Sequence, residues 1–225
     1  MVIPAYNEEK RIAIFFESVG RFDGEIIVIC DGNDKTADVV ETMAKRRHDL
    51  SIRCLRFPNR LGKGGGVIAG LAAAQAPLVG YADADGSTTI EEMCRLYEHL
   101  STFDAVMGSR WMSGSSLLTR QGLMRRLESR GFNLIIRLLF GFTFNDTQCG
   151  AKVFKKSAVD AVLPLLVSRG FEFDVELIWK LEKAGYRIEE VPIEWQNKGD
   201  SRVRKRDMIK MLVGLLRVRF FSKIP

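Results

Sequence analysis

The sequence has few features of a disulfide-rich, membrane-spanning or disordered protein. Its four cysteines, at positions 30, 54, 94 and 149, include no pair separated by two residues, so a structural zinc site or a disulfide scaffold is not expected. No run reaches the roughly 18 to 20 apolar residues that a membrane-spanning helix needs. No secretory signal is expected, because Pro4 and polar residues follow Met1 at once. The hydrophobic share of 46% in 225 residues predicts one globular domain with a full core.

Positive charge is concentrated near the C-terminus. The chain carries 34 lysines and arginines against 28 acidic residues, a net charge of +6. Residues 198–223 alone hold nine basic and two acidic side chains, a net of +7, which leaves the rest of the chain at −1. We therefore expect this end to meet an anionic partner. A nucleic-acid partner is not expected, because no aromatic stacking platforms are interleaved with the basic residues.

Apolar runs alternate with amphipathic stretches over the first half of the chain. The expected strands are 2–3 (ended by Pro4), 25–30, 51–57, 78–82 and 104–108, and the expected helices are 8–19, 34–47, 66–75 and 90–100. This alternation predicts an α/β fold with a mostly parallel sheet and helices on both faces. In such sheets ligands bind at the carboxyl ends of the strands, so the residues that follow strands are the candidates for chemistry.

Basic amphipathic segments are typical of the second half. A basic apolar segment covers 111–142, with a helix or helix pair expected at 120–142. Further helices are expected at 157–166, 173–184 and 207–221, and a strand at 186–193. The segments 120–142 and 207–221 suit helices that lie in a membrane interface. The alternatives are a core-facing helix with a solvated basic face for the first, and a dimer contact or a packed lid for the last.

Two aspartates, Asp83 and Asp85, follow the strand expected at 78–82. If the extended backbone continues, their side chains point to the same side, starting about 6.6 Å apart. A divalent cation relieves the repulsion between two such carboxylates, and Mg²⁺ tends to bind one or two carboxylates together with substrate phosphates. The alternative is an ordinary turn, which Asp85-Gly86-Ser87 also suits.

Two further loops follow strands. Asp31 comes after the strand 25–30, where a carboxylate could accept an N–H of uracil or guanine; the alternative is an Asx turn with a helix cap at Asn33 or Asp34. The glycine-rich loop at 59–66 contains Lys63, and a lysine with exposed N–H groups at a helix start favours an anion. The spacing of a P-loop is absent, and the dehydrogenase fingerprint is not favoured because two strands precede this loop.

Acidic residues also share a face of the helix expected at 173–184. Glu172 and Glu176 lie four positions apart. A catalytic carboxylate is one interpretation, and a salt bridge to Lys180 or Lys183 is the favoured one.

Taken together, these segments resemble the family 2 glycosyltransferases with the GT-A fold, and more narrowly the polyprenyl (dolichyl) phosphate sugar synthases. The resemblance covers nearly the whole chain. It is carried by the ordered motifs Val2-Ile3-Pro4-Ala5-Tyr6-Asn7-Glu8-Glu9, Asp31-Gly32, Asn59-Arg60-Leu61-Gly62-Lys63-Gly64, Asp83-Ala84-Asp85, Gly108-Ser109-Arg110, Asp146-Thr147-Gln148-Cys149-Gly150 and Ser201-Arg202.

The resemblance implies roles for the matching positions. The residues expected to bind the nucleotide sugar are Pro4, Tyr6, Glu8, Asp31, Asp83, Ala84 and Asp85, joined by Lys63 from the glycine-rich loop. The residues expected to hold Mg²⁺ or Mn²⁺ are Asp83, Asp85 and Ser87. The residues expected to receive a lipid phosphate are Arg110, Arg125, Arg126 and Ser129. Catalysis is expected to depend on Asp85, Arg110, Arg126 and Arg202, the last on a loop that closes over the diphosphate.

Three positions depart from the family pattern. Cys30-Asp31 stands in place of a pair of acids, which leaves open the nucleobase that the protein binds. Ser87 stands where mannose synthases have a glutamine, and Gln196 stands where they have an arginine. The sequence therefore leaves the sugar and the nucleotide open.

The implied reaction is transfer of a hexose from a nucleotide diphosphate sugar to a polyprenyl monophosphate, with inversion. A lipid phosphate is already anionic, so it needs cations to approach the diphosphate rather than a general base. The expected partners are the nucleotide sugar, the polyprenyl phosphate and an anionic membrane surface on the cytoplasmic side. We expect a GT-A catalytic domain at 1–197, and a basic loop with an interfacial helix at 198–225.

Two other functions stay open from the sequence. The same fold could act on a hydroxyl acceptor, with Glu172, Asp174 or Glu176 as the base. A non-catalytic module that binds membrane surfaces is the more distant alternative, in which the acidic residues only cap turns.

Overall fold

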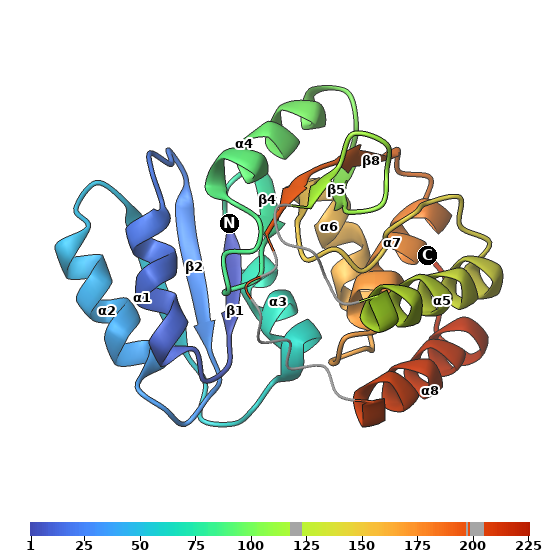
Figure 1. Ribbon diagram of the computed structural model, residues 1–225, viewed down its shortest axis with the longest axis horizontal. Coiled ribbons are helices and arrows are strands. Elements are labelled where there is room, and N and C mark those ends of the chain that lie inside the picture. The colour runs from blue at the N-terminus through green and yellow to red at the C-terminus, as the bar shows by residue number, and fades with distance from the viewer. Residues whose placement is uncertain (118–122, 197, 199–204) are drawn as a thin grey trace.

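A computed structural model describes residues 1–117, 123–196, 198 and 205–225, without the side chains of 117, 123–129, 205 and 206. Within these residues seven strands form one sheet in the order β3-β2-β1-β4-β7-β5-β8 (Figure 1). The strands are β1 (Val2–Ala5), β2 (Glu25–Cys30), β3 (Ser51–Arg56), β4 (Leu78–Tyr81), β5 (Ala105–Ser109), β7 (Lys152–Lys155) and β8 (Ile188–Pro192). All neighbouring strands are parallel except β7, which runs antiparallel to β4 and β5. Short strands β6 (Ser116–Leu117) and β9 (Glu194–Trp195) pair separately.

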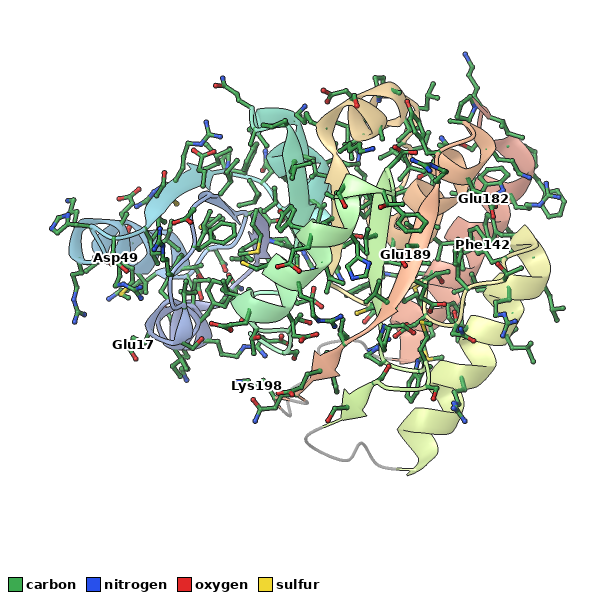
Figure 2. The ribbon with its side chains drawn as sticks, turned by 90° about the horizontal axis from the view of Figure 1, so that it is seen from above. Glu17, Asp49, Phe142, Glu182, Glu189 and Lys198 are labelled. Carbon is green, nitrogen blue, oxygen red and sulfur yellow. The ribbon has the colours of Figure 1, made fainter. Side chains whose placement is uncertain are left out.

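Helices cover both faces of the sheet. One core contains side chains of α1 (Glu9–Ser18), α2 (Thr36–Arg46) and α4 (Ile90–Glu98), which is followed by the 3-10 turn η1 (His99–Ser101). The other core contains side chains of α3 (Gly62–Ala73), α5 (Leu123–Phe140), α6 (Lys156–Val162), α7 (Phe173–Lys183) and α8 (Lys205–Phe221), with η2 (Leu163–Leu165) after α6. Figure 1 shows α5 and α8 side by side at the end of the molecule opposite α2. Figure 2 shows the same separation from above, with Asp49 and Phe142 toward opposite ends.

The alternation of buried residues along β2 explains why one sheet can serve two cores. Ile26 and Val28 lie in the core with α1 and α2, whereas Ile27 and Ile29 lie in the core with α3 and α7. All four are fully buried. Successive side chains of a strand point to opposite faces, so a continuous apolar run is what a sheet covered on both sides requires.

The central antiparallel strand β7 was not expected from the sequence. Its four residues include two lysines, yet Lys152 has no exposed surface. A lysine in the middle of a sheet is stable there because buried Asp174 pairs with it, at 2.8 Å between Lys152 Nζ and Asp174 Oδ1. Neither β6 nor β9 was expected either.

The first strand also continues beyond its expected end. Pro4 lies within β1, opposite Ile29 of β2. Val2 O accepts the N–H of Ala82 on the β4 side, but β1 and β4 pair only at Val2 and Tyr81. Pro4 faces that same side two residues later, where β4 no longer pairs, so its missing N–H costs no ladder hydrogen bond.

The start of α3 is set by glycines. This helix begins at Gly62 (φ +78°), four residues earlier than expected. A Cβ on Gly64 would lie 2.4 Å from the Cβ of Phe173, so only glycine lets α3 approach the start of α7 this closely. The close packing places Lys63 next to Asp174. Among the described residues, no helix combines the length and the apolar character needed to cross a membrane.

Candidate active site

The candidate site lies where β1 and β4 diverge. The strand order reverses direction between these two neighbours, and ligands of open α/β sheets bind outside the carboxyl ends of the strands at such a point. Pro4 and Tyr6 lie at the end of β1, and Asp83 and Asp85 follow β4. The four residues are half-buried. Residues expected to bind the nucleotide sugar therefore lie on both sides of the divergence, and the two aspartates expected to bind a metal lie on the β4 side.

Asp83 is the outer member of a network of four charges. Lys63 Nζ lies 3.0 Å from Asp83 Oδ1 and 3.6 Å from Asp174 Oδ2. Asp174 Oδ1 accepts from Lys152 Nζ at 2.8 Å and from the hydroxyl of Tyr81. The Asp83 side chain is 42% exposed and that of Asp174 only 3%. The network thus runs from the site surface into the core.

The balance of charge in this network shifts the pKa values of its members. Burial lowers the pKa of Lys63, but Asp83 and Asp174 outweigh burial and raise that pKa well above its usual value. Burial raises the pKa of the Asp174 carboxyl, but Lys152 and Lys63 outweigh it and hold the pKa below its usual value. Burial and the Asp174 charge both raise the pKa of Tyr81. At neutral pH Asp174 is therefore an anion between two cations.

Asp85 lies in a tight turn after Asp83. Its Oδ1 accepts the N–H of Ser87 at 2.9 Å, and Gly86 has a positive φ of 68°. The sequence suggested a turn here as the alternative to a metal site. That turn is present, and it holds the Asp85 carboxyl in place. Ala84 and Ser87 are buried, and Ser87 O accepts the N–H of Gln196 at 2.8 Å.

The segment Asp146–Gly150, between α5 and β7, connects Asp83 to Arg110. A Cβ on Gly150 would lie 2.0 Å from Asp83 Oδ2, so the backbone of this segment lies directly against the carboxylate. Cys149 O accepts from Lys152 Nζ at 2.5 Å, and burial raises the pKa of the Cys149 thiol to about 11. At its other end, Asp146 pairs with Arg110. This segment is one of the motifs that carry the family resemblance, but the sequence gives no role to its residues.

Arg110 is held by two hydrogen bonds to one buried carboxylate. Its Nε and Nη2 donate to Asp146 Oδ2 and Oδ1 at 2.7 and 2.9 Å. Burial lowers the pKa of Arg110, but Asp146 outweighs it and raises the pKa above its usual value, and the charge of Asp83 contributes in the same direction. Glu190 in turn accepts the N–H groups of Asn145 and Asp146 at 2.7 to 2.9 Å. Asp146 therefore holds the guanidinium group of Arg110, and Glu190 of β8 holds Asp146.

Aromatic rings surround Arg110. Its guanidinium carbon lies 5.8 Å from the ring centre of Trp111 and 5.6 Å from that of Trp195. Arg130 of α5 lies 5.3 Å from the same Trp111 ring. Two arginines thus approach one tryptophan near the site. Figure 2 shows Lys198 just beyond β9, on the side of the molecule where α5 begins.

The other end of the site is formed by the loops after β1, β2 and β3. Asp31 is buried, and its Oδ2 accepts the N–H of Leu61 at 2.8 Å, which ties the end of β2 to the glycine-rich loop. Arg60 lies over the ring of Tyr6, with 4.0 Å between its guanidinium carbon and the ring centre. A hollow of about 330 Å³ adjoins Asp31; its lining residues are Cys30, Gly32, Asp34, Thr36, Ala37, Arg56, Phe57 and Pro58.

Five of the expected site residues either pair within the fold or lie outside the described residues. Glu8 is buried and forms two hydrogen bonds to Arg11, at 2.7 and 2.8 Å. The backbone of 125, 126 and 129 belongs to α5, but the side chains of Arg125, Arg126 and Ser129 lie outside the described residues. Arg202 lies outside them as well. The roles expected for these four residues remain predictions.

Asp174 and Glu176 of α7 are buried in charge pairs rather than open to a substrate. Glu176 and Lys180 both have no exposed side-chain surface and lie 2.8 Å apart. The Glu176 carboxylate also accepts the N–H groups of Val167 and Ser168. Burial raises the pKa of Glu176, but Lys180 and these N–H groups outweigh it and lower the pKa. Neither Asp174 nor Glu176 therefore has the raised pKa that a general base at neutral pH needs.

The sequence did not predict the part that four charged residues take in the site: Asp146, Lys152, Asp174 and Glu190. Asp174 was considered as a base but not as the partner of Lys63 and Lys152. All four are buried or half-buried charged residues that meet partners 22 to 44 residues away. The one available signal was a charged residue in an otherwise apolar stretch, such as Lys152 beside Val153 and Phe154.

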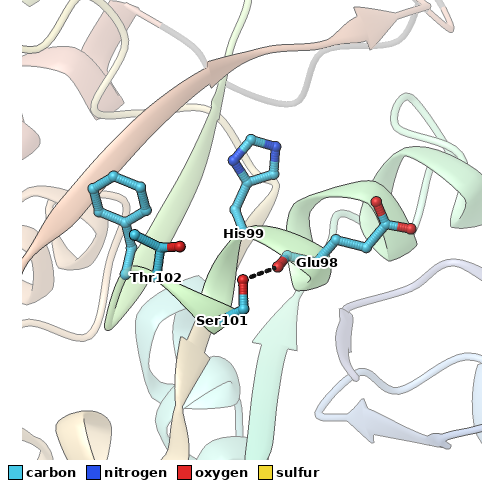
Figure 3. Close-up of a pocket in the computed structure, with 5 residues that line it drawn as sticks. Glu98, His99, Ser101 and Thr102 are labelled. Carbon is cyan, nitrogen blue, oxygen red and sulfur yellow. Dashed lines mark hydrogen bonds between the residues drawn. The ribbon is translucent and has the colours of Figure 1, made fainter.

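A second hollow lies far from this site. It has a volume of about 240 Å³ and is lined by Glu98, His99, Ser101, Thr102 and Phe103 (Figure 3). These residues precede β5, which runs parallel to β4, so they lie at the opposite edge of the sheet from Asp83. His99 Nδ1 lies 2.6 Å from Glu189 Oε2. The hollow is thus separate from the site described above.

Comparison with known proteins identifies the family. Residues 1–163 match the model of glycosyl transferase family 2. The chain belongs to glycosyltransferase family 2. It is 33% identical over 241 residues to a dolichyl-phosphate beta-glucosyltransferase of Trichomonas vaginalis, covering 99% of this chain and 71% of that protein. It is 30% identical to glycosyltransferase AglD of Haloferax volcanii, covering 96% of this chain and 35% of that protein.

Solved structures agree with the fold of this glycosyltransferase. Glucosyl-3-phosphoglycerate synthase of Mycobacterium tuberculosis, in complex with Mg²⁺ and uridine diphosphate, superimposes with a TM-score of 0.70 at 19% identity, covering 100% of this chain and 79% of that chain. The complex of the same enzyme with Mn²⁺ and UDP-glucose gives 0.69 at 19% identity, with 100% and 78% coverage. The expected GT-A fold is confirmed.

Proposed function

We propose that this glycosyltransferase transfers a hexose from a nucleoside diphosphate sugar to a polyprenyl monophosphate. The observation that carries the proposal is that the segment Asp146–Gly150 links Asp83 after β4 to Arg110 after β5. Gly150 lies against the Asp83 carboxylate, and Asp146 pairs with Arg110. Relatives named dolichyl-phosphate beta-glucosyltransferase support the lipid acceptor, with similarity over 97% or more of this chain in Trichomonas vaginalis and Saccharomyces cerevisiae. Their names make glucose the first sugar to test.

The residues around Asp83 fit a divalent cation. Lys63 already places a positive charge 3.0 Å from Asp83 Oδ1, so the carboxylate lies in an environment that accommodates a cation. Gly150 has no side chain, so its backbone lies directly against the other oxygen and holds the carboxylate in place. Carboxylate oxygens are the ligands that Mg²⁺ and Mn²⁺ prefer. No group of three or more acidic, histidine or cysteine ligands occurs in the described part of the chain, so oxygens of the diphosphate would complete the shell.

Each group of this chain then has a task. Asp83 and Asp85 would hold the cation, which neutralises charge on the leaving diphosphate. Asp31, whose chain neighbours Cys30 and Gly32 line the 330 Å³ hollow, would accept an N–H of the nucleobase. Arg110 would pair with the attacking phosphate, because its fork is held in place by Asp146 before substrate arrives.

A phosphate acceptor is favoured over a hydroxyl acceptor. A hydroxyl must lose its proton during attack and needs a base with a pKa near the working pH. The pKa values of Asp174 and Glu176 are lowered, and both carboxylates are already paired. A lipid phosphate attacks as an anion and needs no such base.

The lipid acceptor would be met at a surface formed by α5 and α8. Large apolar side chains are exposed there: Leu134, Ile135 and Leu138 on α5, and Ile209, Val213, Leu216 and Phe220 on α8. Arg130, Lys210 and Arg217 are exposed among them. We name this set the α5–α8 surface. Exposed apolar and basic residues together suit the headgroup region of an anionic bilayer, and the cytoplasmic side stays a prediction.

The test is transfer to a short polyprenyl phosphate. Purified protein with UDP-glucose and Mn²⁺ should form labelled lipid-phosphate glucose. Arg110→Met should abolish transfer while Mn²⁺-dependent binding of UDP survives, because Arg110 would contact the acceptor. Asp85→Asn should lose both. Absence of labelled lipid with every nucleotide sugar tried would refute the proposal, and loss of UDP binding in Arg110→Met would refute the role given to Arg110.

A further inference from the structure

Lys63 lies between one carboxylate in the site and one in the core. Its Nζ is 3.0 Å from Asp83 Oδ1, within hydrogen-bond distance, and 3.6 Å from Asp174 Oδ2, beyond it. The Lys63 side chain is 16% exposed, between the 42% of Asp83 and the 3% of Asp174. A small rotation of a flexible lysine stem would therefore exchange one partner for the other.

Asp174 has capacity for a closer contact with Lys63. Its Oδ1 is engaged by Lys152 Nζ and the Tyr81 hydroxyl. Its Oδ2 faces Lys63 without a hydrogen bond of normal length. Lys152 is anchored on its other side by Cys149 O, so it stays in place whatever Lys63 does. Asp174 is thus a fixed second partner for Lys63.

The charges of the network balance only while Lys63 pairs with Asp83. Two ammonium groups, Lys63 and Lys152, face two carboxylates, Asp83 and Asp174. If Asp83 binds a divalent cation, Asp174 alone remains for two ammonium groups. One positive charge is then in excess beside the place where a diphosphate would bind, and it attracts that diphosphate.

We propose that Lys63 is a displaceable counter-ion that couples cation binding to nucleotide binding. Lys63 holds Asp83 while no divalent cation is bound; when a cation takes Asp83, Lys63 turns to Asp174 and to the diphosphate. This inference rests on the proposed function, because it requires Asp83 to be a cation ligand. Coupling is reciprocal, so the nucleotide must strengthen cation binding by the same factor.

Calorimetry of Mn²⁺ binding, with and without saturating UDP, tests the inference on the purified full chain. Wild type should bind Mn²⁺ weakly alone and more tightly with UDP. Lys63→Met should bind Mn²⁺ alone about tenfold more tightly or better. A neighbouring positive charge lowers a carboxylate's affinity for a proton by about one to three powers of ten, and it repels a divalent cation in the same way. In the same variant, the factor by which UDP improves Mn²⁺ binding should be smaller than in wild type, though still above one, because the diphosphate oxygens would still serve as ligands of the cation.

Two further variants control the result. Lys63→Arg keeps the charge and can pair with both oxygens of Asp83, so its Mn²⁺ affinity should equal or fall below that of wild type. Lys45→Met removes one charge from an exposed position on α2 and should leave both affinities unchanged. Lys63→Met should fold, because Asp174 keeps Lys152 and Tyr81. Lys63→Arg alone is also decisive, since tighter Mn²⁺ binding by this variant contradicts the inference.

The two proposals fail in different ways. Suppose that wild type and Lys63→Met bind Mn²⁺ equally well and that UDP improves Mn²⁺ binding by the same factor in both. The proposal that Lys63 is a displaceable counter-ion would then be wrong, and the proposed function would be unaffected. Absence of UDP-dependent Mn²⁺ binding in wild type would overturn the proposed metal–diphosphate site, and the counter-ion with it.

Discussion

Gly150 leaves no room for a side chain beside Asp83. A Cβ at this position would lie 2.0 Å from Asp83 Oδ2, a distance that requires one of the two groups to move. Asp83 is half-exposed and can turn away, whereas the backbone at 150 is fixed between Cys149, buried in the core, and β7. The carboxylate is therefore the group that moves.

We predict that Gly150→Ala lowers kcat/KM for sugar transfer about 100-fold, because a displacement of about 1 Å at a site can cost that much. The thermal midpoint should change little, since Asp83 can relax into solvent. Gly131→Ala on α5 is the matched control, because an added Cβ there meets nothing within 4 Å. Wild-type activity in Gly150→Ala would show that Asp83 is not positioned by this contact.

The sequence predicted the positions of single residues where they follow strands. Asp31, Asp83 and Asp85 lie just after β2 and β4, as expected, at the carboxyl ends of parallel strands, and their roles stay predictions. Arg110 was found only through the family resemblance. Asp146 was given no role, and Asp174 was considered only as a base for a hydroxyl acceptor. Their ion-pair partners are distant in the chain, and no local pattern encodes a partner that only the fold brings near.

At the scale of elements, α7 depends on one buried ion pair. Glu176 and Lys180 are fully buried, and the Glu176 carboxylate also caps the N–H groups that precede the helix. Removing one member of a buried pair leaves the other charged and unpaired. In the part of the chain that the structure describes, Lys180 would lose its carboxylate partner and keep the carbonyl of Leu165.

We predict that Glu176→Gln lowers the free energy of unfolding at pH 7 by about 3 to 5 kcal/mol, measured by urea denaturation. The folded pKa of Glu176 lies below its usual value of 4.5, so the stabilisation is complete above pH 4.5 and is lost as the pH falls through the folded value. The difference between wild type and variant should therefore narrow below pH 4.5. Glu17→Gln, at an exposed position on α1 (Figure 2), should change stability by less than about 0.5 kcal/mol. A constant difference down to pH 2 would contradict this assignment.

Element types were predicted better than sheet order. The strand at 25–30 and the helix starting at 173 agree with the structure, because apolar runs and helical spacing are local signals. Strand β7 was missed because four residues with two lysines carry no such signal. Its place between β4 and β5 depends on Asp174, which lies on a different element.

At the scale of the whole molecule, the α5–α8 surface lies at one end and α1 and α2 at the other (Figure 1). Leu138 is 77% exposed and Val213 61% exposed. Side chains so exposed contribute nothing to the core, so changing them tests a surface contact without disturbing the fold.

We predict that Leu138→Glu and Val213→Glu each weaken binding to anionic lipid vesicles about tenfold or more, since burying one such side chain contributes about 1.5 to 3 kcal/mol. Vesicle co-sedimentation measures this. Ile14→Glu, on α1 at 60% exposure, is the matched control and should bind as wild type does. Equal binding by all variants would remove the α5–α8 surface as the membrane contact.

The antiparallel strand β7 has a consequence for synthesis. During translation β1 to β4 can assemble from neighbouring segments, but β5 has no direct contact with β4 and must wait for residues 152–155 to leave the ribosome. Until then the outer edge of β4 displays unpaired peptide groups, which are prone to pair with other chains. We therefore expect the nascent half-sheet to be the stage at which this polypeptide is most prone to aggregate.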